Sequence, residues 1–341
     1  MRKRTRTVVV TASLCLAAAG CGSSEGSGAS GGESIKVALP TSVTSFPNSD
    51  IAVAVEEGYF KEFGIEVETT NLSSGASSVK GVVSGSFDIG GASIEPVINS
   101  AVAGGDLRII GSYTDRLEVQ LVTPKSITEP EDLEGEKVGV QEIGAFREVM
   151  TRLVLEGAGL TQEDVEYLPT RSDAYTSALV QGRIKSAILH PEQSVAVAAE
   201  DPDLHALVDL YDVEPNYYYG TYFVSQQWLD ENKDTAEAFM YAITKAHRFM
   251  RDNKDEVVPT IAEETGFSDD VIAEAYETYL TKIEAFPMNE GLDEARLTYT
   301  VERMKELGTL AGDPPDMNEL VDRGPVEAAV EDLGREPGRA P

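Results

Sequence analysis

The sequence has 341 residues, and its 28 Lys and Arg against 59 Asp and Glu give a formal net charge of −31. This excess of negative charge repels nucleic acid and anionic lipid head groups, so we exclude a nucleic-acid function. The two cysteines, Cys15 and Cys21, provide neither a disulfide framework nor a thiolate metal site, and we expect no metal.

The start of the chain has the features of a targeting segment. Basic residues precede an apolar run over 8–19, which suits a signal peptide and is too short to span a bilayer. The small residues before Cys21 resemble a bacterial lipobox, although that motif usually has Leu where Ala18 stands. We expect a signal peptide at 1–20, lipid attachment at Cys21, and a flexible tether at 21–34 that reaches roughly 20 Å. The alternative is an ordinary secretory signal with an incidental cysteine.

Two later stretches share one order of features. Residues 71–103 and 169–200 each contain polar capping residues, an apolar-periodic helix, a glycine that ends it, a short strand and a new helix start. The two glycines are Gly85 and Gly182. The repeat predicts an α/β protein with two similar lobes. Since ligands bind beyond the carboxyl ends of parallel strands, it also predicts a ligand cleft between the lobes.

Four short motifs carry a family resemblance. They are GYF at 58–60, SGSFDIG at 84–90, EDLEGEKVGV at 131–140 and ALVQG at 178–182. Together they resemble the solute-binding proteins of ABC importers for aliphatic sulfonates, taurine, nitrate and thiamine-pyrimidine precursors. The resemblance covers roughly residues 35–310, and it departs at Lys185, where the family usually has Asp.

The resemblance implies a type II periplasmic-binding fold with extra C-terminal helices. Two extended segments, 118–123 and 221–225, would be crossovers whose hinges let the lobes close on a ligand. The implied division is a discontinuous first lobe (35–117 plus 226–333), a second lobe (118–225) and a disordered tail (334–341). Apolar residues three and four apart predict helices over 235–253, 254–265, 269–281 and 293–307.

The candidate ligand-binding residues lie in the loops expected at the carboxyl ends of the strands. Glycines and serines there offer backbone N–H and hydroxyl donors at helix starts, which suits an anionic or oxygen-rich head group. Tyrosines beside a crossover would stack on a flat ring. The candidates are Thr41, Ser42, Phe46, Ser74, Gly75, Ala76, Ser77, Gly91, Ala92, Ser93, Glu142, Gly144, Ala145, His190, Glu192, Tyr217, Tyr218 and Tyr219.

Two ligand classes stay open. An anion of the sulfonate, taurine or nitrate type is the commonest implication of the family. A heteroaromatic nutrient, such as a pyrimidine precursor or a flavin, fits the tyrosines and the carboxylates Glu142 and Glu192 beside His190. The scarcity of arginine near these loops, where only Arg147 falls, slightly favours that second class. Each carboxylate would equally suit a first-turn position that favours the helix dipole, and His190 would equally be a structural histidine.

The remaining histidines are expected outside the pocket. We expect His205 in a loop before a strand and His247 solvated on a helix.

The sequence therefore predicts a lipid-anchored, extracytoplasmic solute-binding protein that delivers a small polar organic nutrient to an ABC permease. We expect a monomer without catalysis and without a cofactor. One alternative is an enzyme resembling the thiamine-pyrimidine synthases of this fold, which use a pyridoxal phosphate lysine and histidine beside an iron-binding cysteine cluster. A mature chain with one N-terminal cysteine lacks that cluster. The other alternative is a surface lipoprotein without a transport role.

Overall fold

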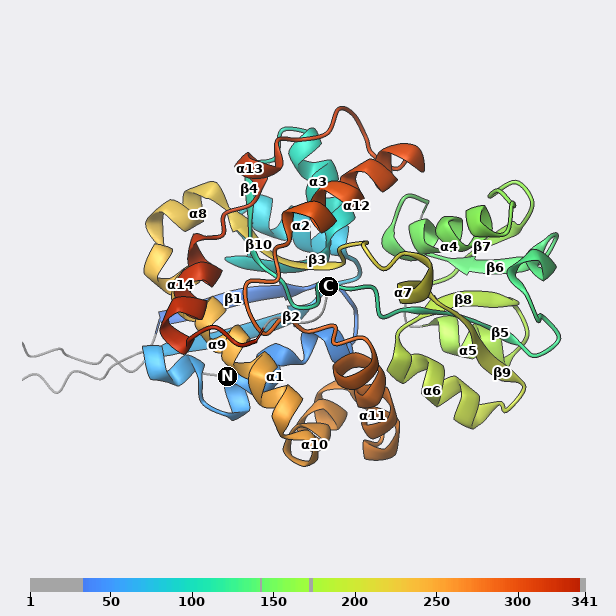
Figure 1. Ribbon diagram of the computed structural model, residues 1–341, viewed down its shortest axis with the longest axis horizontal. Helices are drawn as coiled ribbons and strands as arrows, with labels where there is room; N and C mark the ends of the chain where they lie inside the picture. Colours follow the sequence, from blue (N-terminus) through green and yellow to red (C-terminus); the bar gives the residue numbers. More distant parts are fainter. Residues whose placement is uncertain (1–32, 142, 172–173, 338–341) are drawn as a thin grey trace, which may run out of the picture. The chain divides into compact units, whose positions relative to one another are not determined.

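A computed structural model describes residues 33–141, 143–171 and 174–337, which form two five-stranded sheets with flanking helices (Figure 1). The predicted signal peptide, Cys21 and most of the predicted tether lie outside the described residues. The last two residues assigned to the tether, Glu33 and Ser34, instead begin the first strand.

The first sheet has the strand order β2-β1-β3-β10-β4. Its central strand β1 pairs in parallel with β2 and β3, while β10 runs antiparallel between β3 and β4. The strands are β1 (Glu33–Leu39), β2 (Ile65–Asn71), β3 (Ile89–Ser93), β4 (Leu107–Gly111) and β10 (Gly220–Ser225).

The second sheet repeats this plan with the order β7-β6-β8-β5-β9. Strand β6 pairs in parallel with β7 and β8, and β5 runs antiparallel between β8 and β9. The strands are β5 (Gln120–Pro124), β6 (Lys137–Val140), β7 (Glu166–Pro169), β8 (Ser186–Leu189) and β9 (Leu204–Asp209). The matching orders confirm the predicted α/β fold of two similar halves.

One boundary between the halves differs from the sequence analysis. The predicted second lobe (118–225) included residues 220–225. Strand β10 instead pairs with β3 and β4, so these residues belong to the first sheet. The return crossover therefore precedes Gly220, at which any Cβ would collide with the ring of Tyr113 in the outgoing crossover. Strand β5, by contrast, pairs entirely within the second sheet.

Helices cover both faces of each sheet. In Figure 1, α1 lies on one side of the first sheet and α2 and α3 on the other, and α4 is similarly separated from α5 and α6 around the second sheet. This placement follows from right-handed crossovers. In each half the chain moves outward along the sheet through the first helix and then back across it, so the later helices lie on the opposite face. The helices are α1 (Asp50–Glu56), α2 (Gly75–Val83), α3 (Ile94–Val102), α4 (Phe146–Gly157), α5 (Tyr175–Val180) and α6 (Pro191–Glu200).

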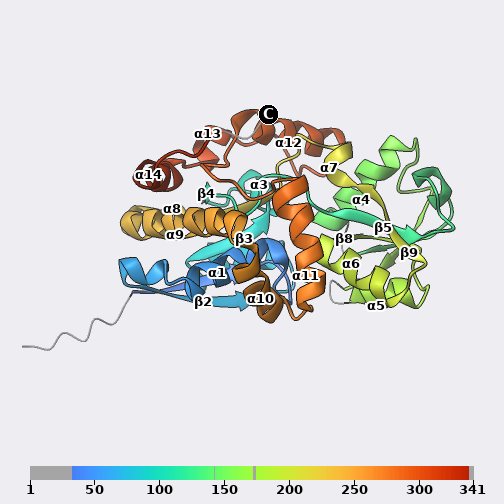
Figure 2. The ribbon, with the colours of Figure 1, turned by 60° about the horizontal axis from the view of Figure 1, so that its bottom comes forward.

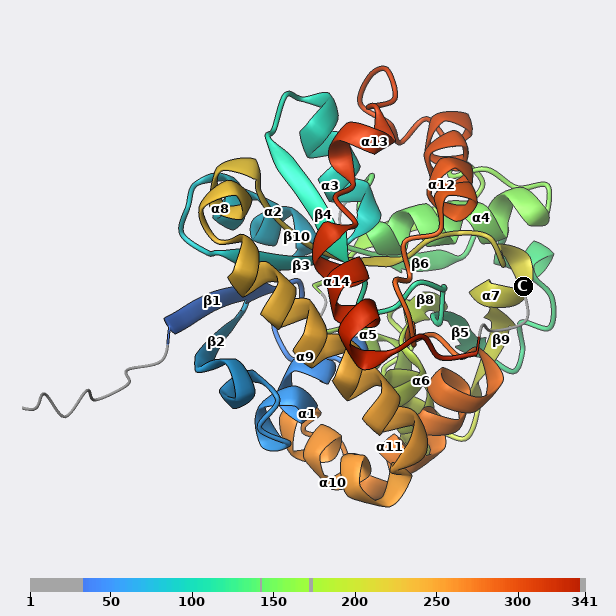
Figure 3. The same ribbon diagram turned by 60° about the vertical axis from the view of Figure 1, so that its left-hand side comes forward.

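Helices also make up most of the C-terminal third. Helix α9 buries Phe239, Met240 and Ile243 against the first half, and α14 packs along it (Figures 2 and 3). The helices are α7 (Leu210–Val213), α8 (Gln226–Glu231), α9 (Lys233–Asp252), α10 (Lys254–Thr265), α11 (Asp269–Tyr276), a π-helix (Glu277–Lys282), α12 (Glu294–Glu306), α13 (Met317–Leu320) and α14 (Gly324–Leu333). None of the helices within the described ranges is both long and apolar enough to cross a membrane.

The short segment after α14 corrects the prediction of a disordered tail for residues 334–337. The Glu336 N–H donates to Asn289 Oδ1 at 3.0 Å, and Asn289 Nδ2 donates to the Glu336 carbonyl at 3.2 Å. Two backbone groups are thereby paired, which fixes this part of the chain.

Candidate ligand-binding site

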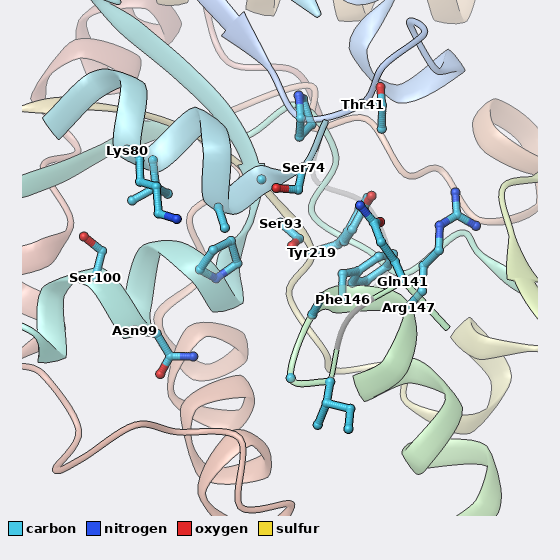
Figure 4. A pocket seen from close by; sticks show the side chains of 18 of the residues that line it. Thr41, Ser74, Lys80, Ser93, Asn99, Ser100, Gln141, Phe146, Arg147 and Tyr219 are labelled. Atoms are coloured by element: carbon cyan, nitrogen blue, oxygen red, sulfur yellow. The ribbon is translucent and has the colours of Figure 1, made fainter. Parts of the chain in front are cut away.

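A cavity of about 410 Å³ lies where the loops after β1, β2, β3, β6 and β8 meet, a size that suits a small organic molecule (Figure 4). All five strands present their carboxyl ends to it, as expected for α/β sheets. Its lining consists of Pro40, Thr41, Ser74, Gly75, Ala76, Val79, Lys80, Ser93, Pro96, Asn99, Ser100, Tyr113, Gln141, Ile143, Gly144, Ala145, Phe146, Arg147, His190 and Tyr219.

Four helix N-termini converge on this cavity. The residues at the N-caps of α2, α3, α4 and α6 are Ser74, Ser93, Ala145 and His190, and all four line it. The first turn of a helix carries unpaired N–H groups and a partial positive charge, and both attract anions. In α2, the Ser74 hydroxyl already accepts from the Ser77 N–H at 3.2 Å. The convergence gives the cavity a positive character before any side chain is counted.

The charged side chains of the lining add to this character. Lys80 and Arg147 lie at opposite ends of the cavity in Figure 4, and no carboxylate is among the described lining residues. The Arg147 guanidinium donates to the Ile188 carbonyl and to Gln193 Oε1, which fixes its position. Lys80 forms no hydrogen bond or ion pair with another described residue. Although the chain has a net charge of −31, the surroundings of this cavity favour the binding of a negatively charged group.

Aromatic rings form one wall. The rings of Phe146 and Tyr219 have centroids 4.5 Å apart, and Tyr113 meets Tyr219 edge-on at 5.7 Å. Tyr113 is fully buried and its hydroxyl has no partner within the described part of the chain. A flat or alkyl ligand body would therefore contact ring faces while its polar atoms reach the helix starts.

A buried pair of titratable groups lies next to Tyr219 of this wall. His190 Nδ1 is 3.1 Å from Glu118 Oε1, and both residues are almost inaccessible to solvent. Burial raises the pKa of Glu118 well above its usual range, and the Glu192 charge adds to this, although a backbone hydrogen bond and Arg147 oppose it. Burial and the Arg147 charge both lower the pKa of His190 well below its usual range. The environment thus favours the uncharged form of each group.

Gly144, which precedes the N-cap of α4, is held by a buried carboxylate. Gly144 has φ +80°, a left-handed conformation that favours glycine, and its N–H donates to Glu148 Oε2 at 2.8 Å. The other Glu148 oxygen accepts from Arg152 Nε at 2.5 Å and from the Tyr167 hydroxyl at 3.0 Å. This network positions the start of α4 at the cavity.

The structure brings many predicted site residues to the cavity. The lining includes Thr41, Ser74, Gly75, Ala76, Ser93, Gly144, Ala145, His190 and Tyr219. Glu142 is not among the described residues.

Other predicted residues have structural contacts instead. Phe46 stacks on Tyr279 with centroids 4.3 Å apart, and the Tyr217 hydroxyl donates to Glu95 Oε1 at 2.8 Å. The Tyr218 N–H donates to Thr300 Oγ1 at 2.7 Å. Gly91 and Ala92 lie within β3, where they pair with β10, and Ser77 belongs to the first turns of α2.

Glu192 faces a neighbouring cavity of about 300 Å³, which Ser42 also lines. Its Oε1 accepts from the Phe46 N–H at 3.2 Å and its Oε2 from the Tyr279 hydroxyl at 2.8 Å. Both partners belong to the half built on the first sheet. The structure therefore places the Glu192 carboxylate in a contact between the halves, where the heteroaromatic hypothesis placed it on the ligand.

Several lining residues escaped the sequence analysis. Pro96, Asn99 and Ser100 follow the spacing of one face of α3, and Val79 and Lys80 lie one turn beyond the cap of α2. Helical spacing from the predicted helix starts would have found them. Glu118 carried no such signal, because its role depends on the fold of a crossover.

The two other histidines correct their predictions. His247 was expected to be solvated, but it is buried in α9, with Nε2 3.0 Å from Asp50 Oδ2 and Nδ1 3.0 Å from the Pro287 carbonyl. His205 lies inside β9 rather than in a loop before a strand. Within the ranges that the structure describes, no three His, Cys, Asp or Glu side chains form a group able to hold a metal ion.

The family model described as "NMT1/THI5 like" matches residues 48–257, which is more than half of the chain. The chain belongs to the NMT1/THI5-like family. A related protein of Brucella abortus (strain 2308), which is named as a binding protein, is 23% identical to this chain over 213 residues. That match covers 62% of the chain and 66% of the relative's length. A protein of Bacillus subtilis (strain 168), named as an aliphatic sulfonates-binding protein, is 24% identical over 261 residues, covering 73% of the chain and 75% of the relative.

Solved structures show the same fold. The alkanesulfonate-binding protein SsuA of Xanthomonas axonopodis pv. citri, bound to MOPS, superposes with a TM-score of 0.70 at 16% identity, covering 85% of this chain and 98% of that one. The periplasmic nitrate-binding protein NrtA of Synechocystis PCC 6803 gives a TM-score of 0.71 at 12% identity, covering 89% of each chain. The NMT1/THI5-like chain thus has the fold of periplasmic binding proteins, as predicted.

Proposed function

We propose that the protein is the extracytoplasmic solute-binding component of an ABC importer and that it captures a small organic anion in the cavity described above. The observation that supports this most is the convergence of four helix N-termini on a space lined by Lys80 and Arg147. The names of relatives and of solved structures with this fold, which include sulfonate- and nitrate-binding proteins, point to the same class.

The contacts of Glu192 favour an anion over the heteroaromatic class. That class drew on Glu142 and Glu192 as acceptors for N–H groups of a ligand, but Glu192 does not line the cavity and each of its oxygens already accepts a hydrogen bond, from Phe46 or Tyr279. The aromatic wall, by contrast, remains free to contact a ligand body. An anionic head group on a flat or alkyl body therefore fits best, and delivery to a membrane permease would follow from the family relationship.

A matched set of ligands tests this proposal. Benzenesulfonate carries an anionic head that only accepts hydrogen bonds, and benzenesulfonamide has nearly the same shape without the charge. We expect benzenesulfonate to raise the melting temperature, because a ligand stabilises by RT ln(1 + [L]/Kd), and the sulfonamide to raise it far less. Equal shifts with both compounds, or a larger shift with the cationic benzamidine, would contradict an anion site.

The charge of the site can be tested separately. Lys80→Met retains the length of the side chain but removes the ammonium group, and we expect it to weaken benzenesulfonate binding by about tenfold, as measured by calorimetry. Lys61→Met is the control, because Lys61 is also exposed and lines neither of the two cavities at the site. An equal effect of the two substitutions would show that only the overall charge matters.

We also propose that the mature protein is a lipoprotein anchored through Cys21 and that it is otherwise a monomer. The sequence features that support this are the small residues before Cys21 and the Gly- and Ser-rich tether after it. Cys21→Ala is expected to leave the protein unprocessed or to release it from membranes, as judged by fractionation and mass spectrometry. Membrane association of the variant that still requires detergent would contradict the anchor.

A further inference from the structure

The pair formed by His190 and Glu118 determines which atom of the histidine faces the cavity. His190 follows β8 at the N-cap of α6 and lines both this cavity and the neighbouring one, although the residue is only 2% exposed. Nδ1 is directed at Glu118 Oε1, 3.1 Å away. No described residue forms a hydrogen bond with Nε2, and Nε2 is not among the solvent-inaccessible side-chain atoms that lack a partner, so this is the ring nitrogen that a ligand can reach.

The position of the shared proton decides whether Nε2 donates or accepts. If Glu118 were ionised, it would accept from Nδ1–H and leave a lone pair on Nε2. If Glu118 is protonated, it donates to Nδ1, and the imidazole proton resides on Nε2. Of these two arrangements with a neutral imidazole, only the second presents a donor to an anion.

Three observations favour the protonated carboxyl. The second oxygen of Glu118, Oε2, is buried without a partner among the described residues, which costs much more for a carboxylate than for a carboxylic acid. The Gln193 backbone N–H faces the His190 side chain in a capping-box arrangement, although without a hydrogen bond of normal geometry. An N–H in this place favours a lone pair on Nδ1, the ring nitrogen nearer the backbone. The directions of the two pKa shifts agree with both points.

The other titratable groups around His190 and Glu118 have partners of their own or are uncharged, so they leave the proton on Glu118. Arg147 of α4 faces it but is held by the Ile188 carbonyl and Gln193, while the Glu192 carboxyl of α6 is held by Phe46 and Tyr279. The remaining titratable neighbours are the hydroxyls of Tyr113, Tyr219 and Tyr279, and burial raises the pKa of each well above its usual range. None of these groups replaces Glu118 as the partner of Nδ1.

We propose that Glu118 is a positioning residue that donates its proton to His190 Nδ1 and so fixes the tautomer in which Nε2–H points into the cavity as a donor to an anionic ligand. The proposal rests on the proposed function for the identity of the ligand, but the tautomer itself is a property of the free protein. It makes the site selective for a head group that accepts hydrogen bonds over one that donates them.

Nitrogen-15 NMR of the free protein tests the tautomer directly. The chain has three histidines, and the His190 signals are assigned by comparison with His190→Gln. We expect a proton on Nε2 and none on Nδ1 at about neutral pH. Glu118→Gln should retain this pattern, because the carboxamide can donate to Nδ1 in the same place. A proton on Nδ1 in the wild-type protein would overturn the proposal, whatever the ligand.

Binding of benzenesulfonate provides the second measurement. His190→Phe keeps a ring but removes the donor, and we expect it to weaken binding about 10- to 100-fold. Glu118→Gln should change the Kd by less than about threefold, since it replaces one neutral donor by another. If Glu118 were ionised, the same substitution would remove a negative charge beside the ligand and strengthen binding about tenfold or more, which would contradict the proposal.

The two measurements separate the proposals. If benzenesulfonate binds but His190 carries its proton on Nδ1, the proposed function stands and the role of Glu118 is refuted. If Nε2–H is observed but benzenesulfonate does not bind, the tautomer stands and the proposed anion site is refuted.

Discussion

At the scale of single residues, Glu192 shows that a carboxylate predicted to contact the ligand can instead join the two halves of the protein. Its side chain is buried, and its hydrogen bonds to the Phe46 N–H and the Tyr279 hydroxyl join helix α6 to the half built on the first sheet. From sequence, a first-turn glutamate beside a histidine fits either role. The difference is decided by which atoms of the other half lie opposite, and a local pattern cannot contain that information.

The buried state of Glu192 predicts a pH dependence. Burial raises the pKa of Glu192 in the folded protein, although hydrogen bonds from Tyr279 and Phe46 lower it. The folded state therefore holds this proton more tightly than the unfolded state does, and the corresponding stabilisation is lost as pH rises.

Glu192→Gln removes this titration. The difference in unfolding free energy between the variant and the wild type is expected to increase in favour of the variant from about pH 5 to about pH 8. Chemical denaturation at both values measures it. Glu95, whose pKa is also raised by burial, contributes equally to both proteins and cancels. The Glu192 charge helps to raise the pKa of Glu118, so its removal lowers that pKa and changes the difference in the same direction. A difference that is independent of pH would show that Glu192 is ionised throughout.

At the scale of elements, local signals predicted the parts whose causes are local. Ser74 caps α2, and Gly85 and Gly182 take the left-handed conformation after α2 and α5, so these helix ends follow from residue types. The end of α4 is less regular, because Gly157 is helical and the left-handed residue is Gly159. A pattern of residue types does not distinguish two glycines that lie two residues apart.

The antiparallel strands were harder to place for the same reason. Strands β5 and β10 were recognised as extended segments, but the sheet to which each belongs depends on long-range pairing. Each strand enters the sheet beside the last parallel strand of a half, with β10 between β3 and β4 and β5 between β8 and β9. Alternation of apolar and polar residues indicates a strand and does not indicate its neighbour.

At the scale of the whole molecule, polar contacts on two sides of the cavity add to a shared apolar core in joining the two halves. Gln141 Nε2 donates to the Ser73 carbonyl at 2.9 Å on one side of it, and the Glu192 contacts lie on the other. Helix α11 also packs against α6 (Figure 2). Ligand binding between such halves is stabilised by closure and is weakened by anything that favours the open state.

Glu192→Ala should shift this balance without touching the ligand. It leaves the Phe46 N–H and the Tyr279 hydroxyl without partners in the closed state, which costs about 1–3 kcal/mol, whereas both groups reach water when the halves separate. We expect small-angle scattering to give a larger radius of gyration for the free variant than for the free wild type. Saturating benzenesulfonate should reduce both radii to similar values, with a higher Kd for the variant.

Glu200→Ala, which changes an exposed residue on the same helix, is the control and should scatter as the wild type does. An unchanged radius for Glu192→Ala, with and without ligand, would mean that the halves form one rigid unit, and the two crossovers would then be connections rather than hinges.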